Sequence, residues 1–363
     1  MAYESFRAIV PAGGAGRRLW PVSRQVNPKF LHDFTGSGSS LLQVTVDRLN
    51  TMADEVVVVS GQTYAQVVQE HVPACAVLAE PLPRDSMPAI ALATAVLMIR
   101  YPREDLVVGS FAADHHITNR EAFEHAVGAA VELARRDEVV TLGIAPTHPA
   151  TAYGYIHPGE EHHTEAGVVA HRVEGFEEKP DAQTAATYVS QGYVWNAGMY
   201  VARSHVLFDH LRRLHPDLAE GVWEVAQAWD SPRRREVAER IWPTLPSVSI
   251  DHALAEPLAP ENQVMVVPAD LGWSDIGDWD AIGSILSGQD PRAPVVLGQS
   301  SRLTTVDAPG AVVAPSKQVV VVGIEGAVVI ETDDAILVTT RQQAQQVKAA
   351  TEKLAEQGLD HLL

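Results

Sequence analysis

The sequence predicts an α/β protein with a doubly wound sheet in the first two-thirds of the chain and a small β-rich unit after it. Strand-like and helix-like segments alternate from the N-terminus, which is typical of a mainly parallel sheet with helices on both faces. Near residue 290 the pattern changes to short β-branched runs separated by Gly, Pro and Asp turns. We therefore expect one domain over residues 1–288 and a second over residues 289–363.

The first domain is expected to place its ligand site at one edge of its sheet. Apolar spacing and β-branched runs predict strands at residues 8–10, 55–60, 76–79 and 106–110, and helices at residues 40–49, 64–71, 88–100 and 121–136. The helix at 88–100 is apolar nearly all round, which indicates that it is buried against the sheet. In such sheets ligands bind beyond the carboxyl ends of the strands.

The second domain is predicted to be all-β apart from one closing helix. Its expected strands cover residues 294–297, 311–314, 319–322, 327–330 and 335–339, and a charged helix follows at 341–356. Spacing alone assigns no chemistry to this part of the chain.

The composition excludes several classes of function. The chain has 363 residues and a formal net charge of -19, so nucleic acid or an anionic membrane is not expected as its main partner. Its longest apolar run, residues 88–99, falls short of the ~18–20 residues that a bilayer span needs. Cys75 is the single cysteine, and the N-terminus lacks a signal pattern. We expect a cytoplasmic protein.

The turn after the first expected strand combines glycines with cations. In order, it contains Ala12, Gly13, Gly14, Gly16, Arg17, Arg18, Arg24 and Lys29, and no Asp or Glu occurs between Pro11 and His32. Glycine allows the backbone to approach a ligand closely, and arginine and lysine supply charge for a polyphosphate. The turn lacks the Gly-Lys-Ser/Thr of a Walker A loop and the third glycine of a dinucleotide-binding loop. The turn is interpreted as a phosphate-binding loop.

Two carboxylates far apart in the chain are candidates for holding a hard cation. Asp114 follows an expected strand in the run Asp-His-His, and Asp275 lies in Gly-Trp-Ser-Asp-Ile-Gly-Asp. A zinc or iron site, a buried structural aspartate and a simple packed turn are the alternatives. Magnesium commonly takes one or two protein carboxylates together with substrate phosphates, which favours Mg²⁺ here.

Two further groups of residues have both an ordinary and a functional interpretation. Arg84, Asp85 and Ser86 precede the buried helix, where they fit either an N-cap or a rigid loop that contacts a nucleotide base. The members of the second group each fit a strand end or a turn when taken singly, and only their order and separations together give them a functional interpretation: Gly154, Tyr155, Glu178, Lys179, Asn196 and Gly198.

Taken together, these motifs resemble those of the sugar-1-phosphate nucleotidyltransferases. The first motif that carries the resemblance is G-G-x-G-x-R-L-x-P with a downstream P-K. The segments around residues 84, 114, 154, 178, 196 and 275 follow it in the order found in the family. The form L-W-P-x-S-R…P-K resembles the mannose-1-phosphate guanylyltransferase branch. The resemblance runs from Phe6 to Lys348 and implies a Rossmann-like doubly wound mixed sheet, the nucleotide-diphospho-sugar transferase fold, with a small C-terminal β-helix-like domain.

The resemblance also implies roles for these residues. It assigns Arg18, Lys29, Asp114 and Asp275 to catalysis, and Asp114 and Asp275 to a Mg²⁺ ion. The implied nucleotide-binding set is Ala12, Gly13, Gly14, Gly16, Arg17, Arg18, Lys29, Arg84, Asp85, Ser86 and Asp114. The implied sugar-phosphate set is Gly154, Tyr155, Glu178, Lys179, Asn196 and Gly198. The chain departs from the family pattern at Arg17 (usually Thr or Ser), Asp85 (Asn), Ser86 (Thr), Ala112 (Pro) and Asp278 (Ser).

The implied reaction converts GTP and α-D-mannose 1-phosphate into GDP-mannose and diphosphate. Longer members of the family add a cupin-type isomerase domain that this sequence does not contain, so a monofunctional enzyme is the expectation. The family and the β-rich C-terminal unit make a homodimer the expected assembly. Two alternatives stay open. The enzyme could accept another nucleotide, such as ATP, or another sugar, such as a fucose or heptose phosphate. Alternatively, the chain could be an inactive regulator that binds nucleotide sugars.

Overall fold

The computed structural model describes residues 3–14, 16–298 and 300–363, and its internal contacts divide the chain into two compact units. The larger unit contains the chain up to Gly13 together with Val46–Ala113 and Ile117–Trp273. The smaller unit contains Gly14–Thr45, Asp114–His116 and Ser274–Leu363. The segment that follows the first strand therefore packs with the C-terminal part of the chain.

In its described residues, the larger unit contains a nine-stranded mixed sheet with the order β3-β2-β1-β4-β9-β6-β10-β8-β7. Its strands are β1 (Phe6–Ala12), β2 (Glu55–Gly61), β3 (Ala76–Glu80), β4 (Val107–Ser110), β6 (Val139–Ile144), β7 (Gly154–His163), β8 (Val169–Glu178), β9 (Val194–Arg203) and β10 (Val264–Pro268). Strands β3, β2, β1 and β4 are parallel, as expected. Beyond β4 the mainly parallel sheet expected from the strand pattern is wrong, because β9 runs antiparallel to both β4 and β6, and β7 and β8 form an antiparallel pair. The mixed sheet that the family resemblance implies is confirmed.

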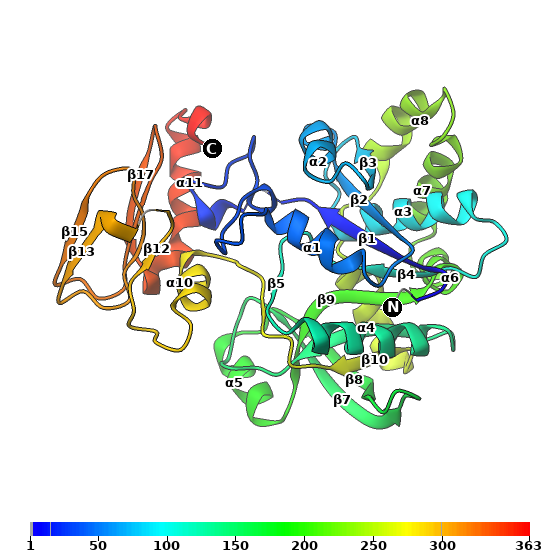
Figure 1. Cartoon of the computed structure of the whole chain (residues 1–363). Helices are drawn as coiled ribbons and strands as arrows, with labels where there is room; N and C mark the ends of the chain where they lie inside the picture. The colour runs from blue at the N-terminus through cyan, green and yellow to red at the C-terminus, as the bar shows by residue number, and fades with distance from the viewer. Residues whose placement is uncertain (1–2, 15, 299) are drawn as a thin grey trace. The chain divides into compact units, whose positions relative to one another are not determined.

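Helices cover both faces of this sheet. The helices of the larger unit are α2 (Ala65–His71), α3 (Ser86–Arg100), α4 (Arg120–Ala134), α5 (Ala182–Ser190), α6 (Ser204–Leu214), α7 (Pro216–Ala228), α8 (Arg234–Ile241) and the short α9 (Glu256–Leu258), most of which are labelled in Figure 1. Helix α1 (Leu41–Leu49) has residues in both units. Among the described residues, no helix combines the length and the apolar character needed to cross a membrane.

Alternation along β1 explains the two covered faces. Ile9 belongs to the core that contains the α3 and α6 side chains. Phe6 points to the opposite face, where its ring contacts Phe111, which in turn contacts Phe123 of α4. The sheet is therefore doubly wound, as the sequence predicts.

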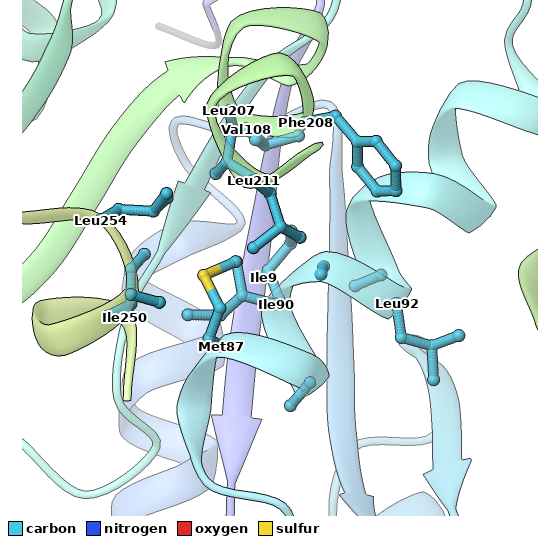
Figure 2. Packing of buried hydrophobic residues seen from close by; sticks show 14 of the residues in the cluster. Ile9, Met87, Ile90, Leu92, Val108, Leu207, Phe208, Leu211, Ile250 and Leu254 are labelled. Atoms are coloured by element: carbon cyan, nitrogen blue, oxygen red, sulfur yellow. The ribbon is translucent and has the colours of Figure 1, made fainter. Parts of the chain in front are cut away.

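The core on the α3 face is built from buried apolar side chains. Figure 2 shows the packing of Ile9, Met87, Ile90, Leu92, Val108, Leu207, Phe208, Leu211, Ile250 and Leu254. Each fully buried side chain of this size contributes about 1.5–3 kcal/mol relative to exposure. The prediction that the helix near residue 88 is buried against the sheet is confirmed, because most of α3 is inaccessible to solvent.

The smaller unit contains short strands in aligned turns. They are β12 (Val295–Val296), β13 (Leu303–Val306), β14 (Val312–Ala314), β15 (Val319–Val322), β16 (Ala327–Glu331) and β17 (Ile336–Thr340). Val295, Val312 and Val328 occupy matching positions on parallel neighbours, and β17 adds an antiparallel strand. A 3₁₀ segment (Arg341–Gln346) precedes α11 (Val347–Glu356), so the predicted single helix over 341–356 is wrong in its first six residues.

The segment after β1 shares the core of this smaller unit. Leu19, Trp20 and Phe34 are buried with Trp279 of α10 (Trp279–Ser287) and with Val312. The Trp279 indole donates a hydrogen bond to the Trp20 carbonyl at 3.0 Å, and the Trp20 indole donates to the Leu362 carbonyl at 2.7 Å. These contacts fix the path of the glycine-rich turn.

Candidate active site

The glycine-rich turn begins where β1 ends and needs glycine at two positions. Gly14 and Gly16 have φ of +89° and +54°, a left-handed conformation that other residues rarely adopt. A Cβ atom on Gly16 would lie 2.7 Å from the Ser23 hydroxyl oxygen and 2.8 Å from Cβ of Lys29. Glycine therefore allows the turn to close on the lysine that the sequence singles out.

Lys29 lies at the centre of a cluster in the smaller unit. Its side chain is largely buried, and Nζ lies 2.9 Å from Oδ2 of Asp114. Nζ also donates to the backbone carbonyl of Asp275 at 2.6 Å and to that of Ile276 at 3.3 Å. The segments around Asp114 and Asp275, far apart in the sequence, thus meet at one ammonium group. A metal ion shared by their two carboxylates stays a prediction.

The charge of Asp114 is maintained by this lysine. Burial alone would raise the pKa of Asp114, but the Lys29 ammonium, the His115 ring and the hydrogen bond from Lys29 together lower it below its usual value. The carboxylate is therefore ionised at neutral pH. The Asp275 carboxylate accepts a hydrogen bond from the backbone N–H of Gly277 at 3.1 Å, which orients it within its turn.

The two neighbouring arginines of the turn have different surroundings. Arg18 is half-buried, and its guanidinium donates to Oε1 of Gln345 at 2.7 Å. Arg17 is exposed and lines a cavity of about 210 Å³ together with residues of α11 and the chain after it, including Glu352 and Asp360. Arg18, the arginine at the family position, is the one that the fold holds.

The loop after β3 belongs to the larger unit and is held by several hydrogen bonds. Asp85 has φ of +67° and caps α3 by accepting a hydrogen bond from the Ser86 N–H at 2.7 Å, so the predicted N-cap is confirmed. The Ser86 hydroxyl accepts from the Ile250 N–H at 2.9 Å, and the Arg84 guanidinium donates to the Pro243 carbonyl at 2.5 Å. These three residues have structural roles, and their contact with a nucleotide base stays a prediction.

Strands β7, β8 and β9 bring the predicted sugar-phosphate residues together in the larger unit. Gly154 pairs with Glu178 across β7 and β8, and a Cβ atom on Gly154 would lie 2.6 Å from the Glu178 carboxylate and 3.4 Å from Cβ of Asn196. The absence of a side chain at Gly154 allows these polar groups to gather. Lys179 follows in the left-handed region, and its ammonium pairs with Glu178 at 2.5 Å.

Asn196 is buried, and hydrogen bonds hold its carboxamide in one orientation. Its Oδ1 accepts from the Thr141 hydroxyl at 2.9 Å and from the Gly198 N–H at 3.2 Å. Its Nδ2 donates to Asp251 Oδ1 at 2.6 Å. The remaining predicted member, Tyr155, is buried and donates its hydroxyl to the Ala150 carbonyl at 2.9 Å, which is a structural role.

Asp251 is a site residue that the sequence does not reveal. It begins a π-helical turn (Asp251–Ala255) and accepts from both Asn196 and the Tyr200 hydroxyl, the latter at 2.7 Å. Burial, and then the charge of Asp251, raise the pKa of Tyr200 well above its usual value, so the phenol stays protonated and donates. In the sequence Asp251 has only the signature of an acidic residue in the first turn of a helix, which is common on protein surfaces.

The carboxyl of Glu178 is affected by the same group. Burial raises the pKa of Glu178 and the Asp251 charge raises it further, while the hydrogen bond and charge of Lys179 lower it in part. The net effect is an increase above the usual value. The larger unit thus brings together the Glu178 and Asp251 carboxylates and the Lys179 ammonium, which pairs with Glu178. This donor and acceptor set is suited to hydroxyls and a phosphate.

The predicted site residues fall into two groups that the fold assembles separately. The smaller unit holds Gly14, Gly16, Arg17, Arg18, Lys29, Asp114 and Asp275. The larger unit holds Ala12, Gly13, Arg84, Asp85, Ser86, Gly154, Tyr155, Glu178, Lys179, Asn196 and Gly198. Within the described residues, no group of three or more His, Cys, Asp or Glu side chains is placed to hold a metal ion.

Comparison with known families identifies the class of protein. Residues 7–288 match the nucleotidyl transferase family model, and residues 301–354 match the MannoseP isomerase/GMP-like β-helix domain model. The chain belongs to the nucleotidyl transferase family. This confirms the family that the sequence motifs predict, and the second match confirms a small β-helix domain at the C-terminal end.

Individual relatives extend the similarity over nearly the whole chain. The chain is 34% identical to the mannose-1-phosphate guanylyltransferase of Escherichia coli K12 over 366 residues, which is 99% of this chain and 75% of that protein. It is also 34% identical to the mannose-1-phosphate guanylyltransferase ManC of Salmonella typhimurium LT2, over 96% of this chain and 73% of that protein. A crystal structure from Thermus thermophilus, described as a mannose-1-phosphate geranyltransferase, superposes with a TM-score of 0.85 at 31% identity and covers 97% of this chain and 99% of that one.

Proposed function

We propose that this chain converts GTP and α-D-mannose 1-phosphate into GDP-mannose and diphosphate. The observation that carries the reaction is the cluster around Lys29, where one ammonium contacts the Asp114 carboxylate and the Asp275 carbonyl. The choice of guanine and mannose is supported by the relatives in E. coli and S. typhimurium, which bear the name mannose-1-phosphate guanylyltransferase.

The proposed chemistry is an in-line displacement at the α-phosphorus of the nucleotide. An oxygen of the sugar phosphate forms the new bond, and the bond to the β-phosphate oxygen breaks as diphosphate leaves. The attacking phosphate is already ionised at neutral pH, so no general base is required. Catalysis consists of positioning and charge neutralisation, with Arg18 and Lys29 on the β- and γ-phosphates.

Asp114 and Asp275 are proposed to hold a Mg²⁺ ion. The donor set fits this ion, because Mg²⁺ prefers carboxylate oxygens and takes one or two of them together with substrate phosphates. The lowered pKa of Asp114 keeps one such ligand ionised at neutral pH. When bound, the ion would neutralise phosphate charge at the reacting centre.

The larger unit is proposed to bind the base and the sugar phosphate. Glu178 and Asn196 would hydrogen bond to sugar hydroxyls, Lys179 would meet the phosphate, and Asp251 would keep the Asn196 amide in one orientation. The Asp85 carboxylate could accept from the N1–H and N2–H₂ groups of guanine. The Val248 N–H donates to the Arg84 carbonyl at 3.3 Å, so the loop after β3 packs beside the segment that leads into Asp251.

The test is a matrix of nucleoside triphosphates against sugar 1-phosphates, followed by diphosphate release in the presence of Mg²⁺. GTP with mannose 1-phosphate is expected to give the highest kcat/KM. A higher value for another pair would replace the proposed substrates. Binding of GDP-mannose without diphosphate release from any pair would instead identify a regulator and refute the enzyme.

We also propose a cytoplasmic homodimer. Exposed apolar side chains on the small unit support association: Val306, Val320, Val322, Ile336 and Val338. The single, buried Cys75, which cannot form an intramolecular disulfide, supports a reducing compartment. Light scattering of the purified protein measures the oligomeric state, and a monomer at micromolar concentration would contradict the proposed homodimer.

A further inference from the structure

A single glutamine in the smaller unit connects Arg18 of the glycine-rich turn to the distant turn that contains Asp278. Gln345 lies in the 3₁₀ segment between β17 and α11. Its Oε1 accepts a hydrogen bond from Nη1 of Arg18 at 2.7 Å, and its Nε2 donates to Oδ2 of Asp278. One carboxamide thereby joins two residues that are far apart in the sequence.

The partners fix the orientation of this carboxamide. A guanidinium can only donate hydrogen bonds and an ionised carboxylate can only accept them. A flipped amide would set Nε2 against the Arg18 donors and Oε1 against the Asp278 acceptors. Gln345 therefore occupies one orientation, which presents a fixed acceptor to Arg18.

Asp278 is itself held firmly. It is 7% exposed, and its Oδ1 accepts from the backbone N–H groups of Asp280 at 2.9 Å and Ala281 at 3.0 Å, which caps α10. This is the same turn that carries Asp275, whose carbonyl accepts from Lys29. The carboxamide thus ties Arg18 to the segment that also orders the lysine.

We propose that Gln345 is a positioning residue that holds the Arg18 guanidinium ready for the leaving diphosphate; this rests on the role of Arg18 in the proposed function. An arginine side chain loses considerable rotamer freedom when it binds a phosphate, and an existing hydrogen bond removes part of that cost before the substrate arrives. Only one of the five N–H donors is used by Gln345, so the others can bind phosphate oxygens.

The first test compares Gln345→Leu with Gln343→Leu, an exposed glutamine of the same 3₁₀ segment. The reaction is run in reverse, from GDP-mannose and diphosphate. Gln345→Leu is expected to raise the KM for diphosphate about tenfold, because a hydrogen bond to a charged group is lost. The KM for GDP-mannose, and all parameters of Gln343→Leu, are expected to stay within twofold of the wild type. Equal increases for both substrates, or no change, would overturn the proposal.

The second test examines the anchor. Asp278→Ser keeps a side-chain oxygen to cap α10 but removes the acceptor for Gln345. If the two residues act through one connection, the double variant with Gln345→Leu raises the KM for diphosphate no more than Gln345→Leu alone. Multiplicative effects would show that they act separately and overturn the proposal.

Arg18→Lys separates this inference from the proposed function. A raised KM for diphosphate in Arg18→Lys, with none in Gln345→Leu, would remove only the role of Gln345. An unchanged KM in Arg18→Lys would remove Arg18 from the diphosphate site and the inference with it.

Discussion

Replacing Glu80 by glutamine is expected to make the protein more stable at alkaline pH and to flatten its pH dependence. Glu80 ends β3 and is 7% exposed, and in the described part of the chain its Oε2 is buried without a hydrogen-bond partner. Burial raises the pKa of Glu80 from 4.5 to about 7. The folded protein therefore keeps a proton that the unfolded chain releases near pH 4.5.

The sign of the effect follows from proton binding. Between pH 4.5 and about 7 the folded state binds more protons than the unfolded state, so the contribution of Glu80 to the free energy of unfolding falls as pH rises. At about 1.36 kcal/mol per pKa unit, the whole interval amounts to roughly 3 kcal/mol. Because glutamine stays neutral, Glu80→Gln avoids this loss.

Urea unfolding of the wild type and Glu80→Gln at pH 5, 6, 7 and 8 measures the difference. The advantage of the variant is expected to increase by about 2.5 kcal/mol between pH 5 and pH 8, because part of the loss has already occurred by pH 5. Glu220→Gln, at an exposed glutamate of α7, serves as the matched control and should show a constant difference. A difference between the wild type and Glu80→Gln that is the same at pH 5 and pH 8 would refute the argument that burial perturbs this carboxyl.

Three further substitutions test the site. Asp275→Asn is expected to lower kcat at least a hundredfold while the Kd for GTP, measured by calorimetry, changes less than threefold; unchanged turnover would remove Asp275 from the metal site. Asp251→Asn is expected to raise the KM for mannose 1-phosphate about tenfold, because Asn196 loses a charged acceptor. Steady-state kinetics measure this, and an equal rise in the KM for GTP would contradict it. Arg17→Thr is expected to leave the KM for GTP within twofold, because Arg17 is exposed and Arg18 holds the family position; a tenfold rise would place Arg17 on the triphosphate.

Local sequence patterns predict the elements of this fold better than their partners. The β-branched run at residues 55–60 becomes β2 over Glu55–Gly61, and the apolar run at 88–100 becomes α3 over Ser86–Arg100. The antiparallel position of β9 between β4 and β6 has no local signal, because pairing direction depends on contacts far along the chain. The 3₁₀ start of the last helix escapes prediction for a similar reason: its residues have good helix propensity, and tertiary contacts decide their geometry.

The same contrast holds for the site. Motif spacing singles out Lys29, Asp114 and Asp275, and the fold brings the three together. Asp251 could not be predicted, because a single acidic residue at a helix start has no distinctive pattern. Its importance arises from two residues distant in sequence, Asn196 and Tyr200, that donate to it.

The shared core of the smaller unit has a consequence for how the protein is made. Trp20 leaves the ribosome more than 340 residues before Leu362, whose carbonyl accepts its indole hydrogen bond. The strands and the helix that bury Leu19 and Trp20 of the glycine-rich turn are therefore missing through most of translation. Until those residues emerge, the nascent chain exposes an apolar segment after its first strand, and such exposed apolar surface is prone to aggregation.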